Sequence, residues 1–294
     1  MQLSIHYTDH MVADAGSYSP SAAKPAQVMA SWTRLGLPFQ VVEPKPVTQA
    51  QFSLAHDAQM VSDILSCQIN NGFNNRSSNV AKSLPYTTGA MLSAAREALD
   101  NGCGAIAPCS GFHHAGYASV GGFCTFNGLM VTAQVLLKEG RVRRIGILDF
   151  DQHWGDGTAD IIDRLGLGGQ VVHYSPCRAY GRASRAEAFV ADIPKLLQAF
   201  VGCDLVLYQA GADPHIDDPL GGWLTTLQLY NRDKKVFRTL RKLGIPVAWN
   251  LAGGYQRDGS GGIRPVLDIH DDTLRVFAEV WGVRSHADLA IAAV

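Results

Sequence analysis

The sequence lacks the long apolar runs and the leader that membrane or exported proteins carry. No hydrophobic stretch approaches the ~18 residues that suggest a transmembrane helix. The N-terminal segment MQLSIHYTDH has neither the basic region nor the apolar region of a signal peptide. We therefore expect no membrane partner, no signal peptide and a cytoplasmic location.

An excess of charge of one sign is also lacking. The chain has 25 Lys and Arg against 26 Asp and Glu, a formal net charge of −1. No basic block stands out, so no nucleic-acid partner is expected. The six cysteines include no CxxC spacing, which favours reduced core thiols over a disulfide framework. Internal repeats and low-complexity segments are absent from the 294 residues as well.

Alternating strand and helix patterns are present throughout the chain. Short runs rich in Val, Ile and Leu predict buried strands at 3–6, 39–42, 105–107, 145–148, 171–174, 205–208 and 246–250. Helical patterns cover 22–35, 57–68, 86–101, 127–139, 157–165, 185–200, 227–243 and 271–280. This alternation indicates parallel βαβ units. We expect residues 1–294 to form one α/β domain with helices on both faces of the sheet, and 70–79 to form a surface loop.

Polar residues flanked by glycine follow four of the predicted strands. In order along the chain they are His113 and His114, then Asp149, Asp151 and His153, then Asp213, and finally Gly253, Gly254 and Tyr255. Ligands of such sheets bind outside the carboxyl ends of the strands. The sequence therefore predicts that these residues share one rim of the sheet.

The segment LDFDQHWGDGT, residues 148–158, is the most informative of the four. Asp149, Asp151 and His153 alternate, so an extended backbone directs them to one face. Neighbouring carboxylates repel, and burying them is costly without a positive partner. A divalent metal would supply that charge, and zinc accepts both imidazole nitrogen and carboxylate oxygen. Asp151 and His153 with Asp213 are the candidate ligands, for Zn²⁺ first and for Fe²⁺ or Mn²⁺ as well.

Several segments resemble the histone deacetylase family in order and spacing. They are GFHHA (111–115), GFCTFN (122–127), DFDQHWGDG (149–157), AGAD (210–213), DPLG (218–221) and GGY (253–255). That family includes bacterial acetylpolyamine amidohydrolases. The resemblance implies the arginase–deacetylase fold, an α/β three-layer sandwich whose central, mostly parallel sheet has about eight strands.

The resemblance also implies a role for each matching residue. The metal ligands are Asp151, His153 and Asp213. The catalytic residues are the tandem histidines His113 and His114, their paired acids Asp149 and Asp156, and Tyr255, which donates to the substrate carbonyl. Substrate contacts are expected from Phe123, Gly122, Asn74 and Gly253. A structural K⁺ or Na⁺ is expected beside Asp149, Asp151 and His153, bound mostly through backbone carbonyls.

These roles form a coherent hydrolysis of an amide bond. Zinc polarises the carbonyl and lowers the pKa of water, His114 accepts and returns a proton while His113 tunes the charge, and Tyr255 stabilises the oxyanion. We expect a zinc-dependent deacetylase that acts on acetyl-lysine, an acetylpolyamine or another short acylamide. The sequence is compatible with a homo-oligomer.

Four residues at three places depart from the family pattern. Trp154 stands where many members have a second histidine after the ligand histidine. Asn74 lies where well-known eukaryotic members carry an aspartate that grips the substrate backbone. Val171 and Val172 occupy the place of a serine that helps to bind the monovalent cation, so only their carbonyls remain.

Two alternative functions are open at this point. The chain could bind acyl-amines or a metal without turnover, as a sensor, although Tyr255 and both tandem histidines are present. It could also be a ureohydrolase-like enzyme with two manganese ions, which would need a second set of carboxylates.

Overall fold

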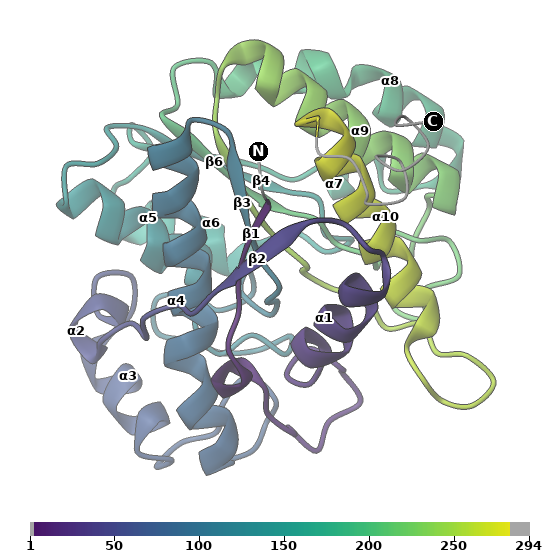
Figure 1. Ribbon diagram of the computed structural model, residues 1–294. Coiled ribbons are helices and arrows are strands. Elements are labelled where there is room, and N and C mark those ends of the chain that lie inside the picture. Colours follow the sequence, from purple (N-terminus) through teal and green to yellow (C-terminus); the bar gives the residue numbers. More distant parts are fainter. Residues whose placement is uncertain (1–2, 283–294) are drawn as a thin grey trace.

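The computed structural model describes residues 3–282, so the last part of the predicted domain, 283–294, lies outside the described residues. Its centre is a seven-stranded sheet in the order β2-β1-β3-β7-β6-β4-β5 (Figure 1). Every pair of neighbouring strands is parallel. The strands are β1 Leu3–His6, β2 Phe39–Val42, β3 Gly104–Ala107, β4 Ile145–Asp149, β5 Val171–Tyr174, β6 Leu205–Gln209 and β7 Val247–Asn250. All seven predicted strands are confirmed. The resemblance implied about eight strands, and the described residues contain seven.

The predicted helices are present, with additional short ones between them. The α-helices are α1 Lys24–Arg34, α2 Gln49–Phe52, α3 Ala58–Leu65, α4 Ser78–Asn101, α5 Gly128–Lys138, α6 Asp156–Arg164, α7 Cys177–Tyr180, α8 Ala186–Leu196, α9 Thr226–Leu243 and α10 Arg264–Val280. Three short 3₁₀ helices are η1 Asp9–Met11, η2 Ala183–Arg185 and η3 Leu197–Phe200.

Two helices begin earlier than the sequence pattern predicted. The helix expected from residue 86 begins at Ser78, because the Ser77 hydroxyl accepts the backbone N–H of Val80 and caps it. Burial of Val80 holds this first part in place although Pro85 removes one helical hydrogen bond. Consequently the loop expected over 70–79 ends at Ser77. Helix α10 begins at Arg264 rather than near 271, with a proline in its first turn.

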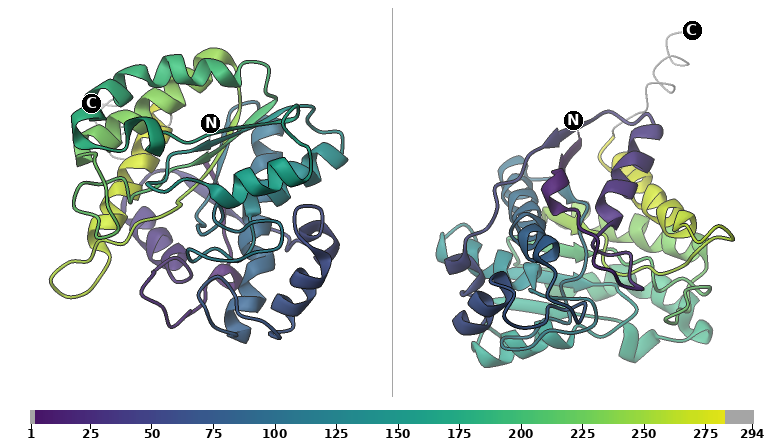
Figure 2. Two further views of the ribbon diagram at one scale, coloured as in Figure 1. Left: turned by 180° about the vertical axis from the view of Figure 1, so that it is seen from behind. Right: turned by 90° about the horizontal axis from the view of Figure 1, so that it is seen from below.

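The two faces of the sheet bury two separate hydrophobic cores. Along β6, Val206 and Tyr208 belong to one core, which contains residues of α1, α8, α9 and α10. Leu205 and Leu207 belong to the other, with residues of α2 to α6. This alternation follows from the two-residue period of a strand. Figures 1 and 2 show the helices on either side of the sheet, which makes three layers.

The sheet order brings the four predicted strand ends together. Strands β3, β7, β6 and β4 are consecutive neighbours in the middle of the sheet. Because they are parallel, their carboxyl ends lie at the same edge. Within residues 3–282, no helix has the length and hydropathy needed to cross a lipid bilayer.

Candidate metal centre and active site

Asp151, His153 and Asp213 lie together at the ends of β4 and β6. One potential ligand atom from each residue lies within 4.8 Å of those of the other two. The Nδ1 atom of His153 is 3.2 Å from Asp151 Oδ1 and 3.2 Å from Asp213 Oδ2. Both carboxylates are buried, and His153 is partly exposed. Two oxygens and one imidazole nitrogen around a small space match the donor set of a catalytic zinc site.

The charges of this cluster are strongly coupled. Hydrogen bonds that His153 donates to Asp151 and then to Asp213 raise the pKa of its imidazole to about 11. Burial, followed by the negative charge of Asp151, raises the pKa of Asp213 to about 7. A cation beside the two carboxylates is therefore strongly favoured.

Backbone N–H groups fix the orientation of both carboxylates. Asp151 accepts from the N–H of His153 at 2.9 Å and from that of Gly253 at 2.8 Å. Asp213 accepts from the N–H of Gln152 at 3.2 Å. A Cβ atom on Gly253 would lie 2.3 Å from Asp213 Oδ2, so only glycine allows the β7 loop to approach the ligands. Gly253 therefore lies close to the two ligand carboxylates. Its predicted contact with substrate stays a prediction.

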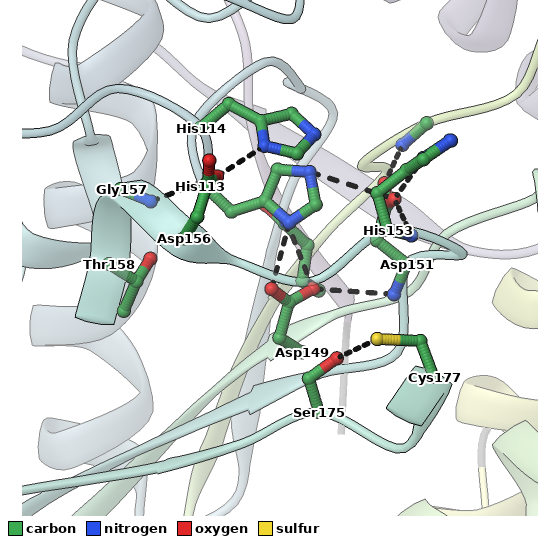
Figure 3. A network of polar contacts seen from close by, with 12 residues as sticks. His113, His114, Asp149, Asp151, His153, Asp156, Gly157, Thr158, Ser175 and Cys177 are labelled. Atoms are coloured by element: carbon green, nitrogen blue, oxygen red, sulfur yellow. Dashed lines mark hydrogen bonds and ion pairs between the residues drawn. The ribbon is translucent and has the colours of Figure 1, made fainter. Parts of the chain in front are cut away.

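The tandem histidines each pair with the predicted acid (Figure 3). His113 Nδ1 lies 2.8 Å from Asp149 Oδ2, and this pair is buried. His114 Nδ1 lies 2.6 Å from Asp156 Oδ1, near the surface. In both dyads Nδ1 faces the acid, so Nε2 is left for other partners. The Nε2 atom of His113 is 3.6 Å from Asp151 Oδ1, which links the dyad to the ligand cluster.

The two adjacent imidazoles have opposite pKa shifts. Burial disfavours the charged form of His113, but the carboxylates of Asp149 and Asp151 outweigh it and raise the pKa to about 9. Burial, followed by the positive charge of His113, lowers the pKa of His114 below its ordinary value. In the metal-free protein, His114 is therefore the more readily neutral member of the pair.

Tyr255 follows the β7 loop and is almost fully buried. Its backbone N–H donates to Asp218 Oδ2 at 2.8 Å, which fixes the start of the loop after Gly254. Burial, followed by the charges of Asp213 and Asp151, raises the pKa of the phenol, so the hydroxyl stays protonated. Aromatic rings border it, with the centroids of Phe123 at 5.8 Å and of Tyr18 at 6.4 Å.

The remaining predicted substrate contacts have different surroundings. A Cβ atom on Gly122 would lie 2.4 Å from His114 Cδ2, so this glycine packs directly on the imidazole. Phe123 contacts both Tyr255 and, at 6.2 Å between ring centroids, Phe73. Asn74 belongs to the loop before α4, where its side-chain oxygen accepts from Asn70 at 2.9 Å. Its proposed contact with substrate stays a prediction.

The surroundings of Asp149 bear on the predicted monovalent-cation site. Its Oδ1 accepts from Gln209 Nε2 at 3.2 Å and from the Asp151 N–H at 3.3 Å. Its Oδ2 bonds His113 and lies 3.8 Å from Nε2 of the buried His173. Trp154, which departs from the family pattern, packs against His173 with ring centroids 5.2 Å apart. The cation itself remains a prediction.

Two buried cations near the ligands were missed in the sequence. Lys24 at the start of α1 is fully buried and donates to the Ala252 carbonyl at 2.6 Å. Burial lowers its pKa to about 8, opposed by the charges of Asp213 and Asp151. Arg232 on α9 is also fully buried. The only signal in the sequence was a charged residue on an otherwise apolar helix face, which long surface side chains also produce.

Comparisons with known proteins identify the family and the fold. The family model described as "Histone deacetylase domain" matches residues 20–175 and 169–263. An uncharacterized protein of Picosynechococcus sp. is 29% identical over 244 residues, which cover 75% of this chain and 80% of that protein. Acetylpolyamine amidohydrolase of Mycoplana ramosa is 29% identical over 171 residues, 49% of each chain, so the match spans about half of that enzyme. The crystal structure of the HDA15 HD domain superposes with a TM-score of 0.77 at 19% identity, covering 95% of this chain and 90% of that one.

Proposed function

The chain belongs to the histone deacetylase family, and from this we propose that it is a zinc-dependent amidohydrolase that removes an acetyl or other short acyl group from an acylated amine. One observation carries the proposal. The Asp151–His153–Asp213 cluster lies directly beside a pair of adjacent histidines, each hydrogen-bonded to its own acid. Hydrolysis of an unactivated amide needs a polarised carbonyl, a general base and a general acid. A metal ion held by the cluster would polarise the carbonyl, and the histidines would serve as base and acid.

The three ligand candidates would hold the metal ion. Their oxygen and nitrogen donors face one another and carry an excess of negative charge, which a divalent cation neutralises. Zinc held there would act as a Lewis acid on the amide carbonyl and lower the pKa of water. Two carboxylates in the set also suit Fe²⁺ or Mn²⁺.

We assign proton transfer to His114. A general base must be unprotonated, and the pKa of His114 is lowered while that of His113 is raised to about 9. Neighbouring groups with opposite pKa shifts are typical of an acid and a base with separate tasks. His114 would accept a proton from water and return it to the leaving amine. The cationic His113, held by Asp149, would stabilise negative charge that develops beside it.

Tyr255 is the proposed donor to the substrate carbonyl oxygen. Its raised phenol pKa keeps the proton in place, and Asp218 holds its backbone. A hydrogen bond that strengthens as the oxygen becomes negative stabilises the transition state more than the substrate.

We propose acetyl-lysine or an acetylated polyamine as the substrate class. The aromatic rings of Phe123 and Tyr18 beside Tyr255 provide apolar surface for the alkyl chain of either substrate. The name of the Mycoplana ramosa relative supports small acylated amines. The seven-stranded sheet that carries the whole site supports a single catalytic domain.

The site favours this reaction over both alternatives. Within residues 3–282, a single cluster of His, Cys, Asp or Glu has the spacing of a metal site, whereas a dinuclear ureohydrolase needs donors for two ions. A non-catalytic sensor would have no use for two histidine–acid dyads beside the cluster.

A deacylation panel tests the proposal. The zinc-loaded protein is incubated with acetyl-lysine peptides, acetylputrescine and acetylspermidine, and with longer acyl groups, and the released amine is quantified. We expect turnover of at least one class, abolished in His153→Ala and retained in Asp163→Ala, which removes an exposed acid of α6. Binding of these compounds without release of amine, with zinc, Fe²⁺ and Mn²⁺ each supplied, would support the sensor alternative instead.

A further inference from the structure

Arg232 contacts both of the loops that carry the candidate metal ligands. It lies on α9 and is fully buried. Its side chain extends to the segments that follow β4 and β6. Its Nη1 donates to the carbonyl oxygen of Phe150 at 3.2 Å and to that of Gly211 at 2.7 Å. Phe150 immediately precedes Asp151, and Gly211 lies two residues before Asp213. One nitrogen atom therefore connects the backbones of the two ligand loops.

The contact occurs where strand pairing stops. The β4–β6 register ends with Asp149 opposite Gln209, and a final bond runs from the Phe150 N–H to the Gln209 carbonyl at 3.0 Å. Asp151 and Asp213 lie beyond this point, so regular pairing of the sheet does not set their spacing. The loops are nevertheless in close contact, since a Cβ atom on Gly211 would lie 2.9 Å from the Asp151 Cα.

The guanidinium is itself held by a second buried group. Arg232 Nε donates to Asp233 Oδ1 at 2.8 Å. Asp233 Oδ2 accepts from the Thr273 hydroxyl of α10 at 2.7 Å, and Tyr208 of β6 also donates to this carboxylate. A buried charge is costly unless it is paired and hydrogen-bonded. Asp233 balances the charge of Arg232, and both bonds of Nη1 go to the ligand loops. This arrangement indicates more than filling of the core.

We propose that Arg232 is a positioning residue that sets the spacing of Asp151 and Asp213 and thereby the affinity of the site for zinc. The inference rests on the metal assignment within the proposed function. Arginine suits the task because its planar group can bond Asp233 through one nitrogen and both carbonyls through another. Lysine would keep the charge but has only one nitrogen, so Asp233 and the two carbonyls would compete for it.

Zinc affinity of the purified full chain tests this without any substrate. Zinc binding to wild type, Arg232→Lys, Arg232→Met and Thr273→Val is measured by competition with a chromogenic chelator, below the unfolding temperature of each apo-protein. The matched control is Thr273→Val, which removes a hydrogen bond to Asp233 but leaves the bonds from Arg232 to both carbonyls. We expect both Arg232 variants to lose about 10–100-fold in zinc affinity, as loss of an outer-sphere partner does. Thr273→Val should unfold at a lower temperature yet bind zinc like wild type.

Three results would overturn the inference. The first is wild-type zinc affinity in a folded Arg232→Lys or Arg232→Met protein. The second is an equal loss in Thr273→Val, which would make the effect a general consequence of core damage. The third is failure of both Arg232 variants to fold, which would make the residue a determinant of the core. A wild type that binds zinc but hydrolyses no acylated amine would instead contradict the proposed function and leave this inference intact.

Discussion

The ammonium group of Lys24 donates a hydrogen bond to the carbonyl oxygen of Ala252 at 2.6 Å, across 228 positions of sequence. Ala252 has a positive φ of 50°, which a residue with a side chain rarely adopts. The next residue, Gly253, donates its N–H to Asp151. A buried cation thus stabilises the strained turn between β7 and Tyr255 and lies close to the carboxylates of the ligand cluster.

The unfolding free energy of the metal-free protein should depend on Lys24 in alkaline solution. Its pKa is about 8 in the folded state and 10.5 in an unperturbed lysine. Between these values the unfolded state binds more protons, so this residue makes stability rise with pH, by about 3 kcal/mol across the window. Denaturant unfolding of wild type and Lys24→Met from pH 7 to 10.5 measures the difference. Parallel curves for the two proteins would show that Lys24 is not a buried titrating cation.

Removal of a ligand should remove zinc and activity together. In Asp151→Ala or His153→Ala, a zinc ion would keep only two of the three side chains that face it. Zinc content after dialysis and amine release are measured on the same samples, with Asp163→Ala as the control. Full zinc occupancy in either ligand variant would contradict the ligand assignment.

Loss of the Tyr255 hydroxyl should affect turnover and spare the metal. Tyr255→Phe keeps the ring packing against Phe123 and Tyr18 but removes the proposed donor to the carbonyl oxygen. We expect kcat to fall by ~10²-fold or more, as for other oxyanion donors, with zinc content unchanged. The measurement is steady-state kinetics with a saturating acetylated substrate. An unchanged kcat would rule out this role. Tyr230→Phe, which removes a phenol hydroxyl on α9 that bonds Glu279, is the matched control.

The pH dependence of activity should respond to Asp156. Its hydrogen bond and negative charge both raise the pKa of His114, against burial and the charge of His113, which lower it. Asp156→Asn removes the charge, so the pKa of His114 should fall further. The acid limb of the kcat/KM profile should then move to lower pH, and the maximum rate should decrease because the imidazole is a weaker base.

That profile is recorded for wild type and Asp156→Asn, each with its zinc content checked. Asp163→Asn, at an exposed acid of the same helix, is the control for charge alone. Superimposable wild-type and Asp156→Asn profiles at equal zinc occupancy would mean that Asp156 does not act on a catalytic histidine. The apparent pKa values describe the coupled dyads rather than one residue.

The sequence alone was sufficient to predict the strands and to identify the polar residues at their ends. Runs such as 145–148 and 205–208 are recognisable because a buried parallel strand is apolar on both faces. The helix starts were less accurate. In the sequence, Pro85 favoured a helix that begins at residue 86. In the structure, the Ser77 cap and the burial of Val80 allow α4 to begin before this proline.

Only the tertiary structure decided which strand ends are neighbours and which charges balance the ligands. Chain order places β3 before β4, β6 and β7, yet in the sheet β7 lies between β3 and β6, which brings the Gly253 N–H to Asp151. Lys24 and Arg232 come from two helices and bond only backbone carbonyls near the ligands. Lys24 bonds a carbonyl of the β7 loop, and Arg232 bonds one carbonyl of each ligand loop. A carbonyl is present at every residue and carries no signature of its partner. Periodicity and side-chain chemistry therefore determined the elements and the candidate ligands, whereas the pairing of buried charges depended on distances that only folding establishes.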